Sequence, residues 1–273
     1  MNTSFSCSIL VSTYNWPQAL ELCLRSLFVQ RVLPHEIIVC DDGSTAETRQ
    51  LIDRLRPQSP VPLRHLWHPD EGFQLARIRN KGLASATGDY VIQIDGDLVL
   101  HPHFIKDHIA LAQPGWFTSG NRFDMSPATT ERLFQTGQYR VGYQWRWSPV
   151  MWRQWRIPAL QNLFAQVYHW KTEYEYVSGC NMAFWRNDLL AINGYDESFT
   201  GWGWEDTDVA IRLMNLGVRM QFLRLGGIQY HLYHPQSSRL NELTNRERAL
   251  RAFASKQIHC EQGVSQYERP FSK

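Results

Sequence analysis

Closely spaced carboxylates follow an apolar segment near the middle of this sequence. Asp95 and Asp97, separated by one glycine, come directly after the apolar run 90–94. Two negative charges so close together are unfavourable unless a proton or a cation neutralises them. Carboxylate oxygens are suitable ligands for hard divalent cations such as Mg²⁺ and Mn²⁺. The same residues are also common in surface turns, so a cation site and a turn are both open interpretations.

Two further acidic pairs have the same ambiguity. Asp41 and Asp42 follow another apolar run, and Glu205 and Asp206 follow a segment rich in glycine and tryptophan. The first pair is compatible with a turn into a helix that is capped by Ser44. The second pair is compatible with the first turn of a helix, where the helix dipole favours negative charge. Spacing alone does not decide between these structural roles and a role in chemistry.

The segments that position these acids alternate between strand and helix patterns. The expected strands are residues 5–12, 36–40, 61–68 and 90–94, and the expected helices are one from Pro17, one ending near Leu55, and residues 73–88 and 102–113. This alternation predicts an α/β fold with a mostly parallel, Rossmann-like twisted sheet flanked by helices. Ligands of such sheets bind beyond the carboxyl ends of the strands. Three expected strands end in polar residues there, which predicts a common site.

The alternation of strand and helix patterns stops after about residue 120. Residues 132–172 contain no Asp or Glu but carry six basic residues and five tryptophans. We expect a first half at 1–120, a basic, Trp-rich helical insert at 121–173, a second half at 174–235, and a helical tail at 236–273, all within a single domain. The second half is expected to contain a strand near 175–178 and a helix ending at Gly217. Strand-like residues 218–235 follow.

The basic, tryptophan-rich segment 140–156 has two interpretations. Aromatic and arginine side chains suit the interface of an anionic membrane, which favours peripheral contact with the inner face of the plasma membrane. The alternative is a lid or a core element.

Composition narrows the class of protein. The formal net charge of +2 is too small to indicate bulk binding of nucleic acid. The five cysteines form no CxxC pair and fit a reducing compartment. We therefore expect a cytoplasmic protein.

Together the motifs resemble those of family 2 glycosyltransferases, which have the GT-A fold. The nucleotide-binding half of that family is matched by the runs SILVSTYNWPQALELCLRSLFVQ, EIIVCDDGS and RNKGLASATGDYVIQIDGD. The run SGCNMAFWRNDLLAINGYDESFTGWGWEDTDVAIRLMNLG resembles the acceptor half shared with bacterial chondroitin-polymerase-type enzymes and animal β-1,4-galactosyltransferases. The resemblance covers roughly residues 5–120 and 174–234.

The resemblance implies an inverting, metal-dependent transfer from a UDP-sugar to a hydroxyl of a glycan or a glycolipid such as a lipid-linked saccharide. The product would contain a β-linkage. The resemblance places the reaction in bacterial surface polysaccharide or lipopolysaccharide synthesis. By the same resemblance, Asp97 binds Mn²⁺ or Mg²⁺ in a DxD motif. His231 is the preferred further metal ligand, and His234 is the alternative.

The resemblance also assigns the nucleotide side. Asp42 would accept a hydrogen bond from the uracil N3–H, with Ser12 and Tyr14 lining the base. Asp95 would lie near the ribose or a metal-bound water. Arg79 would face the diphosphate, where a guanidinium suits phosphate geometry. Arg77, two residues earlier, cannot point the same way on a helix.

On the acceptor side, the resemblance assigns Asp206 as general base. Glu205 would bind acceptor hydroxyls, and Trp202 and Trp204 would stack on a sugar ring. Asn181 would form hydrogen bonds with hydroxyls of the donor sugar or of the acceptor.

Two alternatives remain. A nucleotidyltransferase would require a basic, glycine-rich phosphate loop after the first strand, and residues 12–17 are not one. A non-catalytic glycan-binding or nucleotide-sugar-binding subunit predicts loss of the acids, yet Asp97, Glu205 and Asp206 are all present.

Overall fold

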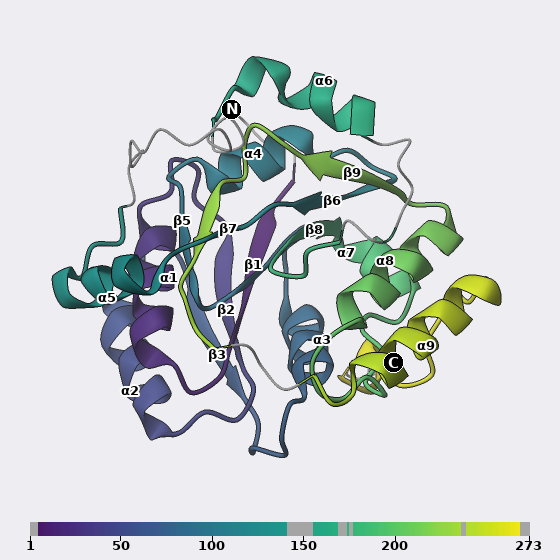
Figure 1. The fold of residues 1–273 in the computed structure, drawn as a ribbon, viewed down its shortest axis with the longest axis horizontal. Coiled ribbons are helices and arrows are strands. Elements are labelled where there is room, and N and C mark those ends of the chain that lie inside the picture. Colours follow the sequence, from purple (N-terminus) through teal and green to yellow (C-terminus); the bar gives the residue numbers. More distant parts are fainter. Residues whose placement is uncertain (1–4, 141–154, 169–173, 175–176, 236–238, 268–273) are drawn as a thin grey trace, which may run out of the picture.

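A computed structural model describes residues 5–140, 155–168, 174, 177–235 and 239–267 (Figure 1). The segment 140–156, for which membrane contact is expected, therefore lies mostly outside the described residues. Among the described residues, the helices are too short or too polar to cross a bilayer.

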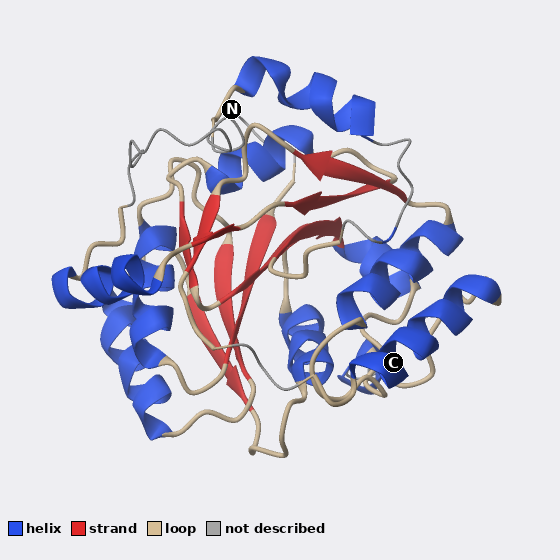
Figure 2. Ribbon diagram, viewed as in Figure 1, coloured by secondary structure: helices blue, strands red, loops and turns tan. Residues whose placement is uncertain are grey.

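A seven-stranded twisted sheet forms the centre of the molecule (Figure 2). Its strand order is β3-β2-β1-β4-β8-β6-β9. The strands are β1 Cys7–Thr13, β2 Glu36–Asp41, β3 Leu63–Trp67, β4 Tyr90–Asp95, β6 Trp116–Gly120, β8 Asn181–Trp185 and β9 Arg219–Leu223. β8 pairs antiparallel with both of its neighbours, and the other pairs are parallel. The strand order reverses between β1 and β4, which is where a sheet of this kind opens a binding crevice.

Helices cover both faces of this sheet. They are α1 Pro17–Phe28, α2 Ala46–Leu55, α3 Leu75–Ser85, α4 Phe104–Leu111, α7 Arg186–Ala191 and α8 Glu205–Leu216. Alternate side chains of β1 show the two faces: Ile9 packs with α1 and α2, whereas Leu10 packs with α3 and α8. The strands β1, β2 and β4 are buried on both sides, as expected for a parallel sheet.

A smaller sheet has the order β5-β10-β7 and lies across the carboxyl edge. Its strands are β5 Leu98–Leu100, β10 Gln229–His231 and β7 Phe123–Asp124. The remaining helices are α5 Pro127–Thr136, α6 Pro158–Tyr168 and α9 Glu242–Ala254. α6 packs on α4 and β9, and α9 packs on α8 (Figure 1).

Some expected boundaries were wrong. Part of the strand expected near 175–178 lies outside the described residues, and Val177 and Ser178 are not in a strand; β8 begins at Asn181, where the apolar side chains of 182–184 fill both faces of the sheet. The strand-like run 218–235 forms two strands in different sheets, β9 and β10, separated by a turn at Leu225, which has a positive φ of 55°. Ser44 does not cap α2; Thr45 precedes that helix, and Ser44 Oγ accepts a hydrogen bond from the Asn15 N–H.

Candidate active site

A cavity of about 1300 Å³ lies at the carboxyl edge of the main sheet. Its walls come from the ends of β1 and β4, the start of α3, the turn at 177–180, the start of α8 and the residues after β10. Trp202 and Trp204 line the cavity together with most of the other residues predicted for the site. The exception is Asn181, which is absent from the lining.

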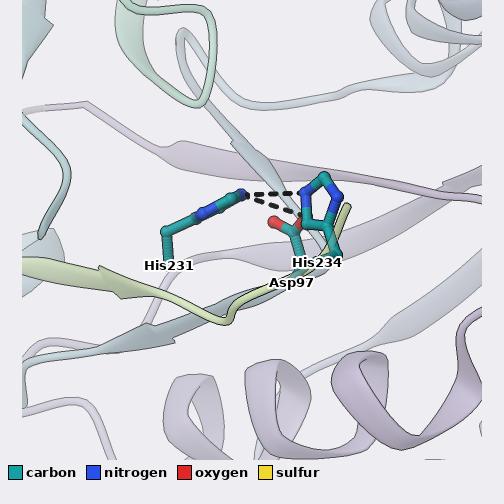
Figure 3. A group of neighbouring side chains, drawn as sticks. All are labelled: Asp97, His231 and His234. Carbon is teal, nitrogen blue, oxygen red and sulfur yellow. Dashed lines mark hydrogen bonds and ion pairs between the residues drawn. The ribbon is translucent and has the colours of Figure 1, made fainter. Parts of the chain in front are cut away.

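Asp97, His231 and His234 form a cluster on one wall (Figure 3). The Nε2 atoms of both histidines lie 3.3 Å from Asp97 Oδ2, and 3.3 Å from each other. Figure 3 shows both imidazole rings directed toward the carboxylate. The two histidines that were alternatives in the sequence therefore occupy the same cluster.

The donor set of this cluster fits a divalent cation. Burial disfavours the Asp97 carboxylate, but hydrogen bonds to the two histidines outweigh this effect and lower its pKa to about 2. Asp97 Oδ1 is buried and has no hydrogen-bond partner among the described residues. An unpaired buried carboxylate oxygen beside two imidazole nitrogens is the arrangement that a cation would complete.

Arg79 joins the acids of the two halves of the chain. Its guanidinium is fully buried. Nη2 lies 3.2 Å from Asp95 Oδ1, and Nη1 lies 2.9 Å from Asp206 Oδ1 and 3.4 Å from Glu205 Oε1. Nε donates to Ser12 Oγ at 3.2 Å. Protein groups thus surround the guanidinium that was expected to face a diphosphate, and that contact stays a prediction.

Asp206 is held by donors that the sequence did not predict. Besides Arg79, its Oδ1 accepts from Gln93 Nε2 at 3.0 Å and from the Tyr195 hydroxyl at 3.1 Å. Gln93 Oε1 is a second acceptor for the single hydroxyl proton of Tyr195, which the two acceptors share. A Cβ on Gly179 would lie 1.6 Å from Asp206 Oδ2, so only glycine fits there. This network fixes the orientation of the carboxylate.

Glu205 is buried next to a second carboxyl group. Burial, reinforced by the adjacent Asp206, raises the pKa of Glu205 from 4.5 to about 8, although Arg79 acts in the opposite direction. Glu205 Oε2 has no hydrogen-bond partner among the described residues. The predominant form at neutral pH is therefore a neutral acid that can donate a hydrogen bond.

The pKa of Asp95 is also shifted by burial. Burial raises its pKa to about 6, Arg79 opposes this, and the charges of Asp97 and Asp206 add to the increase. The carboxyl group remains partly exposed to the cavity, where it pairs with Arg79.

A left-handed turn of the backbone directly precedes α8 and its first two residues, Glu205 and Asp206. Trp204 precedes the helix with a positive φ of 75°, and Gly203 has a φ of 100°. A left-handed backbone is unfavourable for a bulky residue and is typical of functional turns. Trp202 lines the cavity, and the Arg239 guanidinium lies 4.7 Å from the centre of its ring.

The predicted base-binding residues lie at the ends of β1 and β2. Asp42 Oδ1 pairs with His68 Nε2 at 2.7 Å, and Oδ2 accepts from the Gln74 N–H at 2.9 Å. Burial raises the pKa of Asp42, and these hydrogen bonds oppose the increase. Tyr14 is half exposed at the cavity and donates to Asp70.

Asn181 is fully buried and points into the protein. Its Oδ1 pairs with His108 Nε2 at 2.8 Å, and its Nδ2 donates to the carbonyls of Asn121 and Gly227. These contacts join β8 to the loops beside it. The expected contact with sugar hydroxyls is therefore not carried into the proposal below.

Two family models match the chain. The model of glycosyl transferase family 2 matches residues 8–189, and the model described as the N-terminal domain of galactosyltransferase matches residues 161–235. Chondroitin synthase of Escherichia coli is 26% identical over 245 residues, covering 84% of this chain and 35% of that protein. Validoxylamine A glucosyltransferase of Streptomyces hygroscopicus subsp. limoneus is 25% identical over 235 residues, covering 80% and 49%.

Solved structures share the fold. S. aureus TarS 1-349 in complex with UDP gives a TM-score of 0.62 at 18% identity, covering 96% of this chain and 68% of that one. A mannosyltransferase from Pyrobaculum calidifontis, in complex with GDP-Man and Mn²⁺, gives 0.61 at 19% identity, covering 97% and 67%. The expected GT-A fold is confirmed. The chain spans only about a quarter to a half of the curated relatives, from 25% to 49% of their length.

Proposed function

The chain belongs to glycosyl transferase family 2, and from this premise we propose that it is an inverting, metal-dependent glycosyltransferase. It transfers a sugar from a UDP-sugar to a hydroxyl of a glycan or glycolipid acceptor and forms a β-linkage. The observation that carries the proposal is the common cavity of Asp206 and the cluster of Asp97, His231 and His234. A base and a cation-binding cluster that share one cavity suit a displacement with a diphosphate leaving group.

The cluster would hold Mn²⁺ or Mg²⁺. A cation bound there stabilises the negative charge that develops on the diphosphate. Asp97 supplies a carboxylate oxygen, and the histidines supply two imidazole nitrogens. Hydrogen bonding to Asp97 raises the pKa of His234, so protons compete with the cation at low pH.

Asp206 acts as the general base. Its carboxylate takes the proton of an acceptor hydroxyl while the acceptor oxygen bonds to the anomeric carbon. The bond from that carbon to the diphosphate oxygen breaks, and UDP leaves with the bonding electrons. Attack from the opposite face of the sugar converts an α-linked donor into a β-linked product. Because Arg79, Gln93 and Tyr195 hold Oδ1, the orientation of the base is set before the acceptor binds.

The remaining site residues bind the substrates. Asp42 accepts from the uracil N3–H, and Ser12 and Tyr14 lie beside it at the base. Asp95 faces the ribose or a metal-bound water. On the other side, neutral Glu205 donates to an acceptor hydroxyl.

The tryptophans complete the acceptor side. Trp202, which is 37% exposed, offers a ring face to a sugar, with Trp204 beside it at the start of α8.

The acceptor is proposed to be carried on a lipid at the inner face of the plasma membrane, in surface polysaccharide synthesis. Support comes from exposed apolar side chains at and after the end of the arginine-rich segment 140–156, namely Trp155, Leu160 and Leu163. Co-sedimentation with anionic vesicles, but not with neutral ones, is the expected result. If the protein sediments with neither kind of vesicle, membrane contact is contradicted.

The direct test is a panel of UDP-, GDP- and ADP-sugars assayed for nucleotide release with and without Mn²⁺. Mn²⁺-stimulated release of UDP from at least one UDP-sugar is expected. If neither binding nor nucleotide release occurs with any donor and any divalent cation, the proposal is wrong.

A further inference from the structure

The small sheet places three polar residues at one end. Asp97 directly precedes β5, His231 ends β10, and Asp124 ends β7. Backbone hydrogen bonds fix their spacing, because the Leu232 N–H donates to the Asp97 carbonyl at 2.9 Å and the Met125 N–H donates to the His231 carbonyl at 2.8 Å. His231 and Asp124 are direct partners in the β10–β7 register. The sheet is therefore a rigid platform for these side chains.

His231 contacts a carboxylate on each side of its ring. Nδ1 lies 3.2 Å from Asp124 Oδ1, and Nε2 lies 3.3 Å from Asp97 Oδ2. A carboxylate only accepts hydrogen bonds, so Nδ1 carries the proton shared with Asp124. With Nδ1 donating to Asp124, Nε2 can donate to Asp97 only in the protonated ring, and the neutral ring has a lone pair on Nε2, which is the form that binds a metal.

The Nδ1 atom of His234 is also hydrogen-bonded, but to a backbone carbonyl instead of a carboxylate. Its Nδ1 donates to the Pro235 carbonyl at 2.7 Å, which leaves the Nε2 lone pair of the neutral ring facing the cluster. The two Nε2 atoms are 3.3 Å apart. Two lone pairs at that distance repel each other unless a proton or a cation lies between them. Asp124 and the Pro235 carbonyl, by accepting from Nδ1, therefore both favour the ring forms that can bind one cation.

Asp124 is itself held in place. Arg122 Nε lies 3.2 Å from Asp124 Oδ1, the same oxygen that faces His231. Arg122 and Asp124 both line the cavity. The Asp124 side chain is 68% exposed, so its contact with His231 does not serve to fill the core.

We propose that Asp124 is a positioning residue for the metal site, acting through His231, with Arg122 fixing its carboxylate. This inference rests on the metal dependence proposed above and extends it to a residue outside the ligand cluster. An outer carboxylate of this kind sets the tautomer and orientation of a metal-binding histidine and makes the imidazole a stronger ligand. Its loss typically weakens metal affinity by about 10- to 100-fold.

The test is Mn²⁺ binding to the apo protein, measured by electron paramagnetic resonance of free Mn²⁺, with and without UDP. Asp124→Ala should weaken Mn²⁺ binding by about 10- to 100-fold, while the melting temperature of the apo protein stays close to that of the wild type. Asp124→Asn should retain part of the affinity, because an amide oxygen can still accept from Nδ1–H. Asp53→Ala, which removes another exposed aspartate paired with an arginine, is the matched control and should change nothing.

The outcomes separate this inference from the proposed function. If the wild type binds Mn²⁺, His231→Ala weakens binding and Asp124→Ala does not, the positioning role is wrong and the metal site stands. A loss of apo stability without a loss of Mn²⁺ affinity also overturns it, since that would be a purely structural role. If the wild type binds no Mn²⁺ even with UDP, the metal dependence fails and this inference fails with it.

Discussion

Arg79 Nη1 lies 2.9 Å from Asp206 Oδ1, across 127 positions of the sequence. The same guanidinium contacts Asp95 at the end of β4. The buried Arg79 guanidinium therefore connects Asp95 with the proposed base. The two halves recognised in the sequence meet at this side chain, and its charge offsets the repulsion among the carboxylates around it.

Replacing Arg79 should be far more costly than replacing Arg77. Arg79→Ala leaves buried carboxylates without their cation and should reduce the free energy of unfolding by about 3–5 kcal/mol. Arg77, on the same helix, pairs with Glu71 near the surface, and Arg77→Ala should cost less than about 1 kcal/mol. Urea denaturation of both variants measures this difference. Equal losses would contradict the bridging role of Arg79.

Glu205 should make stability depend on pH. Its pKa rises from 4.5 to about 8 on folding, so the folded protein binds more protons than the unfolded chain between these values. The contribution of Glu205 to stability is therefore full below about pH 4.5 and is lost as the pH rises toward 8. The slope is at most about 1.4 kcal/mol per pH unit.

Glu205→Gln should remove this dependence, because an amide does not titrate. The measurement is the free energy of unfolding between pH 5 and pH 8 for the wild type and the variant. An identical slope in both proteins would show that Glu205 is not held in its neutral form.

His68 should affect donor binding more than turnover. His68→Ala removes the partner of Asp42 and should raise KM for the UDP-sugar by about tenfold, with a small change in kcat. His65→Ala is the matched control: it removes a similar pair with Asp41, whose carboxylate does not line the cavity. Initial-rate kinetics at varied donor concentration compare the two, and an equal rise in KM in both variants would contradict the prediction.

Both histidines of the cluster should bind the metal. His231→Ala and His234→Ala should each weaken Mn²⁺ binding at least tenfold, because each removes one nitrogen beside Asp97. His259→Ala removes an exposed histidine outside the cavity and is the control. Calorimetric titration of Mn²⁺ distinguishes the variants, and wild-type affinity in either cluster variant would exclude that histidine as a ligand.

The sequence predicted the fold class and the family correctly, because strand and helix patterns and ordered motifs are local signals. It also predicted that acids from several strands meet at one edge, since parallel strands end together. It did not predict how Arg79 is used. A helical arginine near a phosphate site suggests a contact with phosphate, whereas the structure surrounds it with carboxylates that are distant in sequence.

Other parts of the site carried only weak signals. Gln93 is a polar residue inside the apolar strand β4, and His68 directly follows β3, so both could have been noticed. Tyr195 gave no signal, because its contact with Asp206 depends on how the loop before α8 returns to the sheet. Asn181 was predicted to contact sugar hydroxyls because it lies within a motif, whereas in the structure its side chain donates to buried backbone carbonyls.

The most direct measurement compares the turnover of Asp206→Asn and Glu205→Gln with an active UDP-sugar and its acceptor at pH 7. Asp206→Asn should lower kcat by about 10²- to 10⁴-fold with little change in UDP binding, because the amide cannot take the proton. Glu205→Gln resembles the neutral form of Glu205 and should retain most of the turnover. Wild-type turnover by Asp206→Asn would contradict the assignment of the base, and with it the central claim about this site.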